Sequence, residues 1–123
     1  LGCDVGAIVK SLLFKTEDNF ILCLVPGDKT CSLIKLKKIK NKKEISMASP
    51  EEVKTQTGYT IGGVSPLGHL NKVEIFIDKS LDRFIDLFAA AGHPNCVFKI
   101  NFNNIKKITN GRIEDIIEWS NLN

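Results

Sequence analysis

The amino-acid sequence predicts a mixed sheet with peripheral helices, a fold of the α/β or α+β class. β-rich apolar runs occur in neighbouring pairs, at residues 7–14 and 19–25 and again at 88–91 and 96–100, which indicates hairpins. Helix-start residues lie between these pairs, most clearly at Ser49. Strand pairs interspersed with helices are typical of a sheet that carries helices at its periphery.

The N-terminal half is expected to contain the first strand pair, a lysine-rich helix and a short strand. Pro26-Gly27-Asp28 marks a turn after the second strand. A short helix is expected at 33–39, because apolar residues recur there at intervals of three and leave the lysines on the outer side. Residues 44–47 predict a short strand.

A well-marked helix follows. Ser49 can cap its N-terminus, Pro50 suits the first helical position and Glu52 can complete a capping box. The helix is expected to end near Gln56, just before Gly58.

The C-terminal half is expected to contain the second strand pair and further helices. Residues 73–78 predict a strand and residues 80–84 a helical turn. Asn101 can cap a helix that Asn110-Gly111 ends. Residues 114–119 predict a short last helix.

Length and composition predict one domain spanning residues 1–123. Hydrophobic residues make up 43% of the chain, which argues against disorder, and no apolar run approaches the roughly 20 residues that cross a bilayer. The opening Leu1-Gly2-Cys3-Asp4 lacks the pattern of a signal peptide, so we expect a cytoplasmic protein. The four cysteines form no close pair and only two histidines accompany them, so we expect free thiols, no metal site and no cofactor.

Two features carry candidate chemistry. Lys10 lies in the middle of an apolar strand, with Ile8 and Leu12 on its own face. Its side chain either extends to the sheet edge with its stem packed, or is presented in a cleft to an anionic or ester-bearing ligand. The segment 57–69, called the glycine loop below, holds four of the nine glycines. It is either a tight connection or a loop whose N–H groups face a carbonyl oxygen, since its spacing fits neither a dinucleotide fingerprint nor a P-loop.

A run of six lysines lies between Lys35 and Lys43. Such a run either contacts the phosphates of a nucleic acid or forms a solvated helix face. Both interpretations are open from the sequence.

Four segments resemble, in the same order, the motifs of the YbaK/prolyl-tRNA editing family. They are Ile8–Phe14, Ser46–Val53, Thr57–Gly68 and Ala89–Asn95. The resemblance implies a mixed, largely antiparallel, barrel-like sheet with surrounding helices. It also implies an aminoacyl-tRNA hydrolase that proofreads translation by clearing mischarged tRNA. The expected partners are mischarged tRNA, in the first place tRNA(Pro), and prolyl-tRNA synthetase.

The resemblance also implies a site. Lys10 matches the family's most important functional residue, and the N–H groups around Gly62 and Gly63 are expected to bind the ester carbonyl. We therefore predict Lys10 and Gly63 as catalytic residues. The predicted substrate-binding residues are Tyr59, Gly62, Ser65, Pro66, Gly68, His69, Gly92 and His93. The predicted tRNA-binding residues are Lys38, Lys40 and Lys42.

Two departures from the family concern specificity. Its upstream segment, which helps wall the pocket, is expected to be absent, and residues 96–99 lack the acidic residue of some cysteine-specific members. We predict cysteine on tRNA(Pro) as the substrate, with alanine or serine as alternatives. The alternative functions are a non-catalytic tRNA- or synthetase-binding module, an editing domain detached from a prolyl-tRNA synthetase, and a small hydrolase of free esters or amides.

Overall fold

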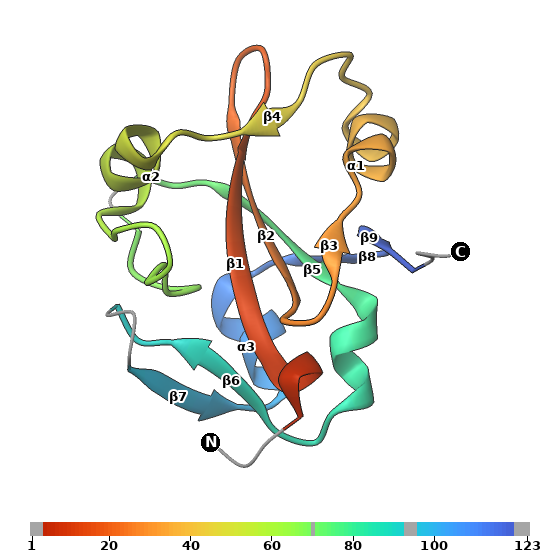
Figure 1. The fold of residues 1–123 in the computed structure, drawn as a ribbon, viewed down its shortest axis with the longest axis vertical. Helices are drawn as coiled ribbons and strands as arrows, with labels where there is room; N and C mark the ends of the chain where they lie inside the picture. The colour runs from red at the N-terminus through yellow and green to blue at the C-terminus, as the bar shows by residue number, and fades with distance from the viewer. Residues whose placement is uncertain (1–3, 70, 93–95, 120–123) are drawn as a thin grey trace.

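The structure is a computed structural model that describes residues 4–69, 71–92 and 96–119. Figure 1 shows long strands at the centre, with helices and shorter strands around them. In chain order the elements are η1 (Val5–Ala7), β1 (Ile8–Lys15), β2 (Phe20–Pro26), β3 (Thr30–Cys31), α1 (Leu33–Lys40), β4 (Ser46–Met47), α2 (Pro50–Thr57), β5 (Glu74–Asp78), η2 (Lys79–Arg83), β6 (Leu87–Ala90), β7 (Val97–Ile100), α3 (Phe102–Thr109), β8 (Arg112–Glu114) and β9 (Ile117–Glu118).

The main sheet has the strand order β7-β6-β1-β2-β5-β8, and β4 pairs with β1 outside this path. A second small sheet joins β3 to β9. The strand pairs β1–β2, β1–β4, β6–β7 and β3–β9 are antiparallel, whereas β1–β6, β2–β5 and β5–β8 are parallel. The predicted mixed, mostly antiparallel sheet with helices around it is therefore confirmed.

The core lies on both faces of the β1–β2 pair. Successive side chains of a strand point to opposite faces, so Leu22 and Leu24 pack in one apolar cluster while Ile21, Cys23 and Val25 pack in another. All five side chains are fully buried, which explains why the sequence of β2 is a continuous apolar run. Complete burial of each large aliphatic side chain contributes about 1.5–3 kcal/mol relative to exposure.

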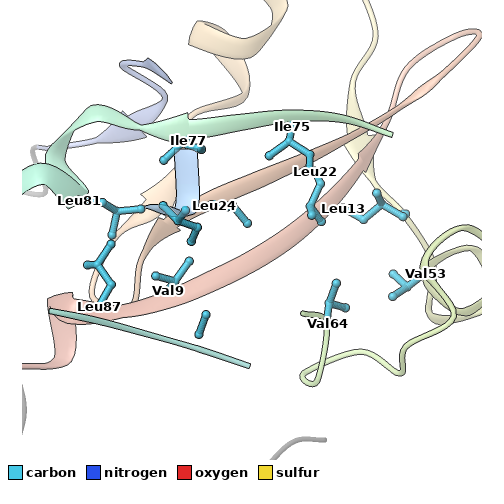
Figure 2. Close-up of a cluster of buried hydrophobic side chains, with 13 residues drawn as sticks. Val9, Leu13, Leu22, Leu24, Val53, Val64, Ile75, Ile77, Leu81 and Leu87 are labelled. Carbon is cyan, nitrogen blue, oxygen red and sulfur yellow. The ribbon is translucent and has the colours of Figure 1, made fainter. Parts of the chain in front are cut away.

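Different helices cover these two faces. α2 and the glycine loop contribute Val53 and Val64 to the first cluster, and Figure 2 shows both side chains reaching toward β1. α1 contributes Leu36 to the second cluster. In Figure 1, α1 accordingly lies across β1 and β2 from α2 and the glycine loop.

The predicted helix caps are confirmed. Ser49 and Glu52 form a complete capping box at α2, which ends at Gly58 with φ 83°. Asn101 caps α3, and Asn110 ends it in the left-handed conformation. These ends form as expected because each depends on a local side chain rather than on distant contacts.

The predicted helix at 114–119 is wrong, because this segment forms strand β9 and the end of β8. Ile116 and Ile117 are fully buried, and β-branched residues suit a pleated surface. The buried carboxylate of Asp78 accepts a hydrogen bond from the N–H of Ile116 at 2.9 Å. Pairing with β5 and β3 therefore determines the local structure. The short strand β3, which the sequence analysis did not predict, is the partner of β9.

An ion pair connects β1 to α2 and provides a test by pH. The Lys15 ammonium lies 2.8 Å from the Glu52 carboxylate, and this contact, with the N–H of Ser49, holds the pKa of Glu52 below its ordinary value of 4.5. A lowered folded-state pKa contributes stability above the ordinary pKa that is lost as pH falls through the folded-state pKa. We expect the midpoint urea concentration of unfolding to be higher for wild type than for Glu52→Gln at neutral pH. This difference should decrease as the pH is lowered and Glu52 becomes protonated.

The matched control is Glu51→Gln, because Glu51 lies in the same helical turn and makes no ion pair among the described residues. Its midpoint should follow that of wild type at each pH. A Glu52→Gln difference that stays constant from neutral to acidic pH would contradict the role of the ion pair.

Candidate functional site

Strand β1 has an edge that is only partly covered. β6 pairs with Ile8 and Val9 at one end, and β4 pairs with Phe14 and Lys15 at the other. Residues 10–13 have no strand partner on this edge among the described residues, and of these Leu13 has its carbonyl engaged by the N–H of Ala48 at 3.0 Å. The main chain can therefore meet a ligand here without breaking the sheet.

A pocket of about 350 Å³ lies against this edge. It is called the open-edge pocket here. Its walls are mainly apolar and come from β1, β4, α2, the glycine loop, β6 and β7. The lining residues are Ile8, Val9, Lys10, Ser11, Leu12, Leu13, Met47, Ala48, Val53, Ile61, Gly62, Val64, Ala90 and Val97. Small-molecule sites have this character, with apolar walls and a few polar groups.

Lys10 and Ser11 are the polar side chains of this lining, and they lie on opposite faces of β1. Lys10 faces the side covered by α1, where its ammonium donates a hydrogen bond to the carbonyl of Lys29 at 2.5 Å. An ammonium has three donors, so this bond positions Lys10 and leaves donors for a ligand. The Lys10 side chain is half-buried. Its apolar stem is packed while its ammonium faces the cleft, so the two interpretations of Lys10 from the sequence both describe part of its geometry.

The glycine loop meets the pocket through a turn at Gly62. The N–H of Gly63 donates to the carbonyl of Thr60 at 2.9 Å, and Gly62 has φ 86°. A positive φ at this third position is what a type II turn requires, which explains the glycine. Gly63 itself is buried and its N–H is engaged, whereas Gly62 lines the pocket. Of the two glycines whose N–H groups are expected to bind the ester carbonyl, Gly62 therefore lies at the pocket and Gly63 in the turn beside it.

Tyr59 joins the glycine loop to the loop after β6. Its hydroxyl donates to the carbonyl of Leu67 at 2.7 Å. A Cβ at Gly68 would lie 3.0 Å from this hydroxyl, and a Cβ at Gly92 would lie 3.1 Å from the ring. The ring of His69 packs edge-on against Tyr59, with centroids 6.1 Å apart. Both loops are therefore held around one aromatic ring.

The predicted substrate-binding residues do not all reach one cavity. Lys10 and Gly62 line the open-edge pocket, but Pro66, Gly68 and His69 line a separate open groove of about 780 Å³. Tyr59, Ser65 and Gly92 lie in the lining of neither cavity and support the loops instead. His93 lies outside the described residues.

His69 has a local role. Its Nε2 lies 2.7 Å from the carbonyl oxygen of Ser65, which fits hydrogen bonding within the loop. The contact that the structure shows for His69 is therefore one within its own loop. The sequence did not indicate Ser11 or most of the apolar wall as part of a pocket. The motif at 46–53 indicated part of that wall, but the open edge of β1 becomes visible only once β4 and β6 are placed.

The lysine run is partly neutralised. Lys35 pairs with Asp115 and Lys42 with Asp18, at 2.9 and 3.2 Å, and Lys40 pairs with Glu74. Among the described residues, the lysines of the run without an ion pair are Lys37, Lys38 and Lys43. Of the predicted tRNA-binding set, Lys38 is the one whose charge is not paired.

None of the described cysteines lines the open-edge pocket: Cys23 and Cys31 are buried, and Cys96 is exposed. Cys23 and Cys31 are buried together in the second cluster, and their mutual hydrogen bond and burial raise the pKa of the Cys23 thiol. A thiol with a raised pKa is a poor nucleophile at neutral pH. Within residues 4–69, 71–92 and 96–119, no group of three or more His, Cys, Asp or Glu side chains is arranged to hold a metal, and no helix is of the length and apolarity that a bilayer crossing requires.

Known proteins are similar to this chain in sequence and in fold. A family model for the aminoacyl-tRNA editing domain matches residues 1–108. YwhH, an uncharacterized protein of Bacillus subtilis, is 34% identical over 121 residues, which span 92% of this chain and 72% of YwhH. The proline–tRNA ligase of Thermosipho melanesiensis is 34% identical over 103 residues, which span 84% of this chain but only 18% of the ligase. The solved structure of a candidate trans-editing enzyme for prolyl tRNA synthetase has a TM-score of 0.92 and 34% identity, covering 96% of this chain and 74% of that one.

Proposed function

Because the chain belongs to the aminoacyl-tRNA editing domain family, we propose that it hydrolyses the ester bond of mischarged tRNA with the aminoacyl group in the open-edge pocket. The observation that carries this proposal is the meeting of Lys10, Gly62 and the uncovered edge of β1 at one apolar pocket. The substrate we propose is tRNA(Pro) carrying a small wrong amino acid, and the place of action is the cytoplasm. Prolyl-tRNA synthetase is the proposed source of this substrate.

The reaction is an ester hydrolysis that requires no protein nucleophile. A water oxygen adds to the ester carbonyl, and the bond from carbonyl carbon to ribose oxygen then breaks. The ribose oxygen takes a proton that originates from the water, which releases the amino acid and uncharged tRNA. We propose that the N–H of Gly62 stabilises the oxyanion, a contribution of roughly 2.7–4 kcal/mol for one such donor. The neighbouring ribose hydroxyl, or a cysteine substrate's own thiol, positions the attacking water.

Lys10 is proposed to hold the terminal ribose or its phosphate. Because Lys10 and Ser11 lie on opposite faces of β1, the substrate would cross the open edge of the strand. The nucleotide would lie on the face covered by α1, and the amino-acid side chain would lie between β1 and the glycine loop. The apolar walls there, including Val53 and Val64, favour a small uncharged side chain.

The proposal is tested by single-turnover deacylation of cysteinyl-, alanyl-, seryl- and prolyl-tRNA(Pro). We expect cysteinyl-tRNA to be cleared fastest and prolyl-tRNA to persist. Uncharged tRNA should compete, which separates this activity from hydrolysis of free esters. Binding of tRNA without hydrolysis of any of the four esters would instead support a non-catalytic binding module.

The unpaired lysines of the run give a prediction for tRNA binding. Each phosphate contact to a duplex adds about 0.9 to the slope of log affinity against log salt. If Lys37, Lys38 and Lys43 contact the acceptor stem, changing all three to glutamine should reduce that slope by about 2 to 3. The measurement is tRNA binding by filter retention over a series of salt concentrations.

The matched control changes Lys35, Lys40 and Lys42 to glutamine, which alters the net charge equally but removes lysines that already have carboxylate partners. This variant should keep a slope close to that of wild type, provided that circular dichroism shows it folded. If wild type and both variants show the same slope of log affinity against log salt, the lysine run is a solvated helix face and does not contact tRNA.

A further inference from the structure

Ser11 presents a buried polar atom that the fold does not use. Its hydroxyl oxygen is covered from solvent and makes no hydrogen bond with any described residue. It is the one side-chain oxygen or nitrogen in this condition among residues 4–69, 71–92 and 96–119. A buried hydroxyl without a partner costs about 1–3 kcal/mol. Alanine would avoid that cost, so the stability of the fold does not account for serine here.

The position of Ser11 relates this hydroxyl to the proposed substrate. Ser11 lines the open-edge pocket and lies on the face of β1 that carries Val9 and Leu13. Val53 and Val64 approach the same face from α2 and the glycine loop, as Figure 2 shows. A serine side chain has three staggered positions about one bond, so its hydroxyl can turn toward a ligand that enters between these walls.

We propose that Ser11 is the specificity-determining residue of the pocket and selects amino acids whose side chain ends in a hydroxyl or thiol. The inference rests on the proposed function and names the substrate class of the same site. A group on the substrate that pairs with the Ser11 hydroxyl removes the cost of burying it. Alanine has no γ atom and offers the Ser11 hydroxyl no partner, so that cost stays in place and serine and cysteine esters are favoured over alanine esters.

The substrate's α-amino group is a less suitable partner for Ser11. It carries a positive charge when protonated, and the surroundings of Ser11 are the apolar side chains of Val9, Leu13, Val53 and Val64. Placing an ammonium among such groups is far more costly than placing a neutral hydroxyl or thiol there. The uncovered main chain of residues 10–12 offers the α-amino group a better environment, at the sheet edge rather than on its apolar face.

The test compares wild type with Ser11→Ala in single-turnover hydrolysis of seryl-, cysteinyl- and alanyl-tRNA(Pro). We expect the seryl rate to fall about tenfold and the cysteinyl rate to fall less, because a thiol is the weaker hydrogen-bonding group, while the alanyl rate stays unchanged. Ser11→Thr keeps the hydroxyl, and threonine is compatible with a strand. This variant should therefore retain the preference for seryl over alanyl esters that Ser11→Ala loses. Thermal unfolding of Ser11→Ala should occur at or above the wild-type temperature.

Three outcomes overturn the inference. Equal losses on all three esters would assign the Ser11 hydroxyl to a part that every substrate shares. Unchanged rates would mean that the Ser11 hydroxyl does not contact the substrate. A clear loss of thermal stability in Ser11→Ala would mean that the hydroxyl has a partner within the fold. Failure of the proposed function is distinct, since wild type would then hydrolyse none of the esters. In that case, binding of non-hydrolysable amide analogues of seryl- and alanyl-adenosine still decides: the inference requires Ser11→Ala to weaken the seryl analogue about tenfold and leave the alanyl analogue unchanged.

Discussion

Replacing Lys10 by alanine is expected to lower single-turnover deacylation by about 100-fold, the size of loss that follows misplacement of the reacting ester. The ammonium is positioned by the carbonyl of Lys29 at 2.5 Å and lines the open-edge pocket. Its removal deprives the terminal ribose or phosphate of its cation. The fold should persist, because the side chain is half-buried and makes one hydrogen bond to the main chain.

The matched control is Lys15→Ala on the same strand. Lys15 is exposed and pairs with Glu52 outside the pocket. Exposed ion pairs contribute little to stability because solvent screens them, so this variant should keep both its fold and its deacylation rate. If Lys10→Ala hydrolyses cysteinyl-tRNA at the wild-type rate, Lys10 has no role in the reaction.

Replacing Gly62 by valine is expected to reduce turnover about 100-fold, the size of loss that follows a small misplacement of reacting groups. Gly62 has φ 86°, and a Cβ built there meets no atom within 4 Å. The larger side chain therefore fits without a clash with the protein, but it occupies space at the pocket where substrate and main chain must approach. The left-handed conformation adds a strain of about 1–2 kcal/mol, measurable by urea unfolding.

Gly68→Ala separates the pocket effect from loop strain. Gly68 also has a positive φ, at 71°, and a Cβ there lies 3.0 Å from the Tyr59 hydroxyl. Gly68 lines the open groove rather than the open-edge pocket. Its variant should lose at least as much stability as Gly62→Val and much less turnover. If turnover instead follows stability in both variants, the glycine loop has a structural role alone.

Much of the fold could be predicted because its determinants are local. The apolar runs of β1 and β2 alternate between two buried faces, and the capping residues Ser49 and Asn101 act on the N–H groups of their own helices. The prediction of a helix at 114–119 was wrong for the opposite reason. Its strand conformation depends on Asp78 and on β3, which lie far away in the sequence.

The candidate site could be predicted only in outline. The sequence indicated Lys10 and the glycine loop, but it could not divide the loop into Gly62 at the pocket, Gly63 in the turn and Gly68 beside Tyr59. That division depends on backbone dihedral angles. The ion pairs of Lys40 and Lys42 and the unpartnered hydroxyl of Ser11 depend on side chains brought together by the sheet.

The central claim is that the open-edge pocket holds the aminoacyl group, and amide chemical shifts measure this most directly. A chain of 123 residues suits two-dimensional amide spectra during titration with a non-hydrolysable amide analogue of cysteinyl-adenosine. We predict that the largest shift changes occur at Ser11, Gly62 and Ala90, which line the pocket from β1, the glycine loop and β6. Changes confined to Lys72, Asn110 and Arg112, which line the open groove, would contradict it.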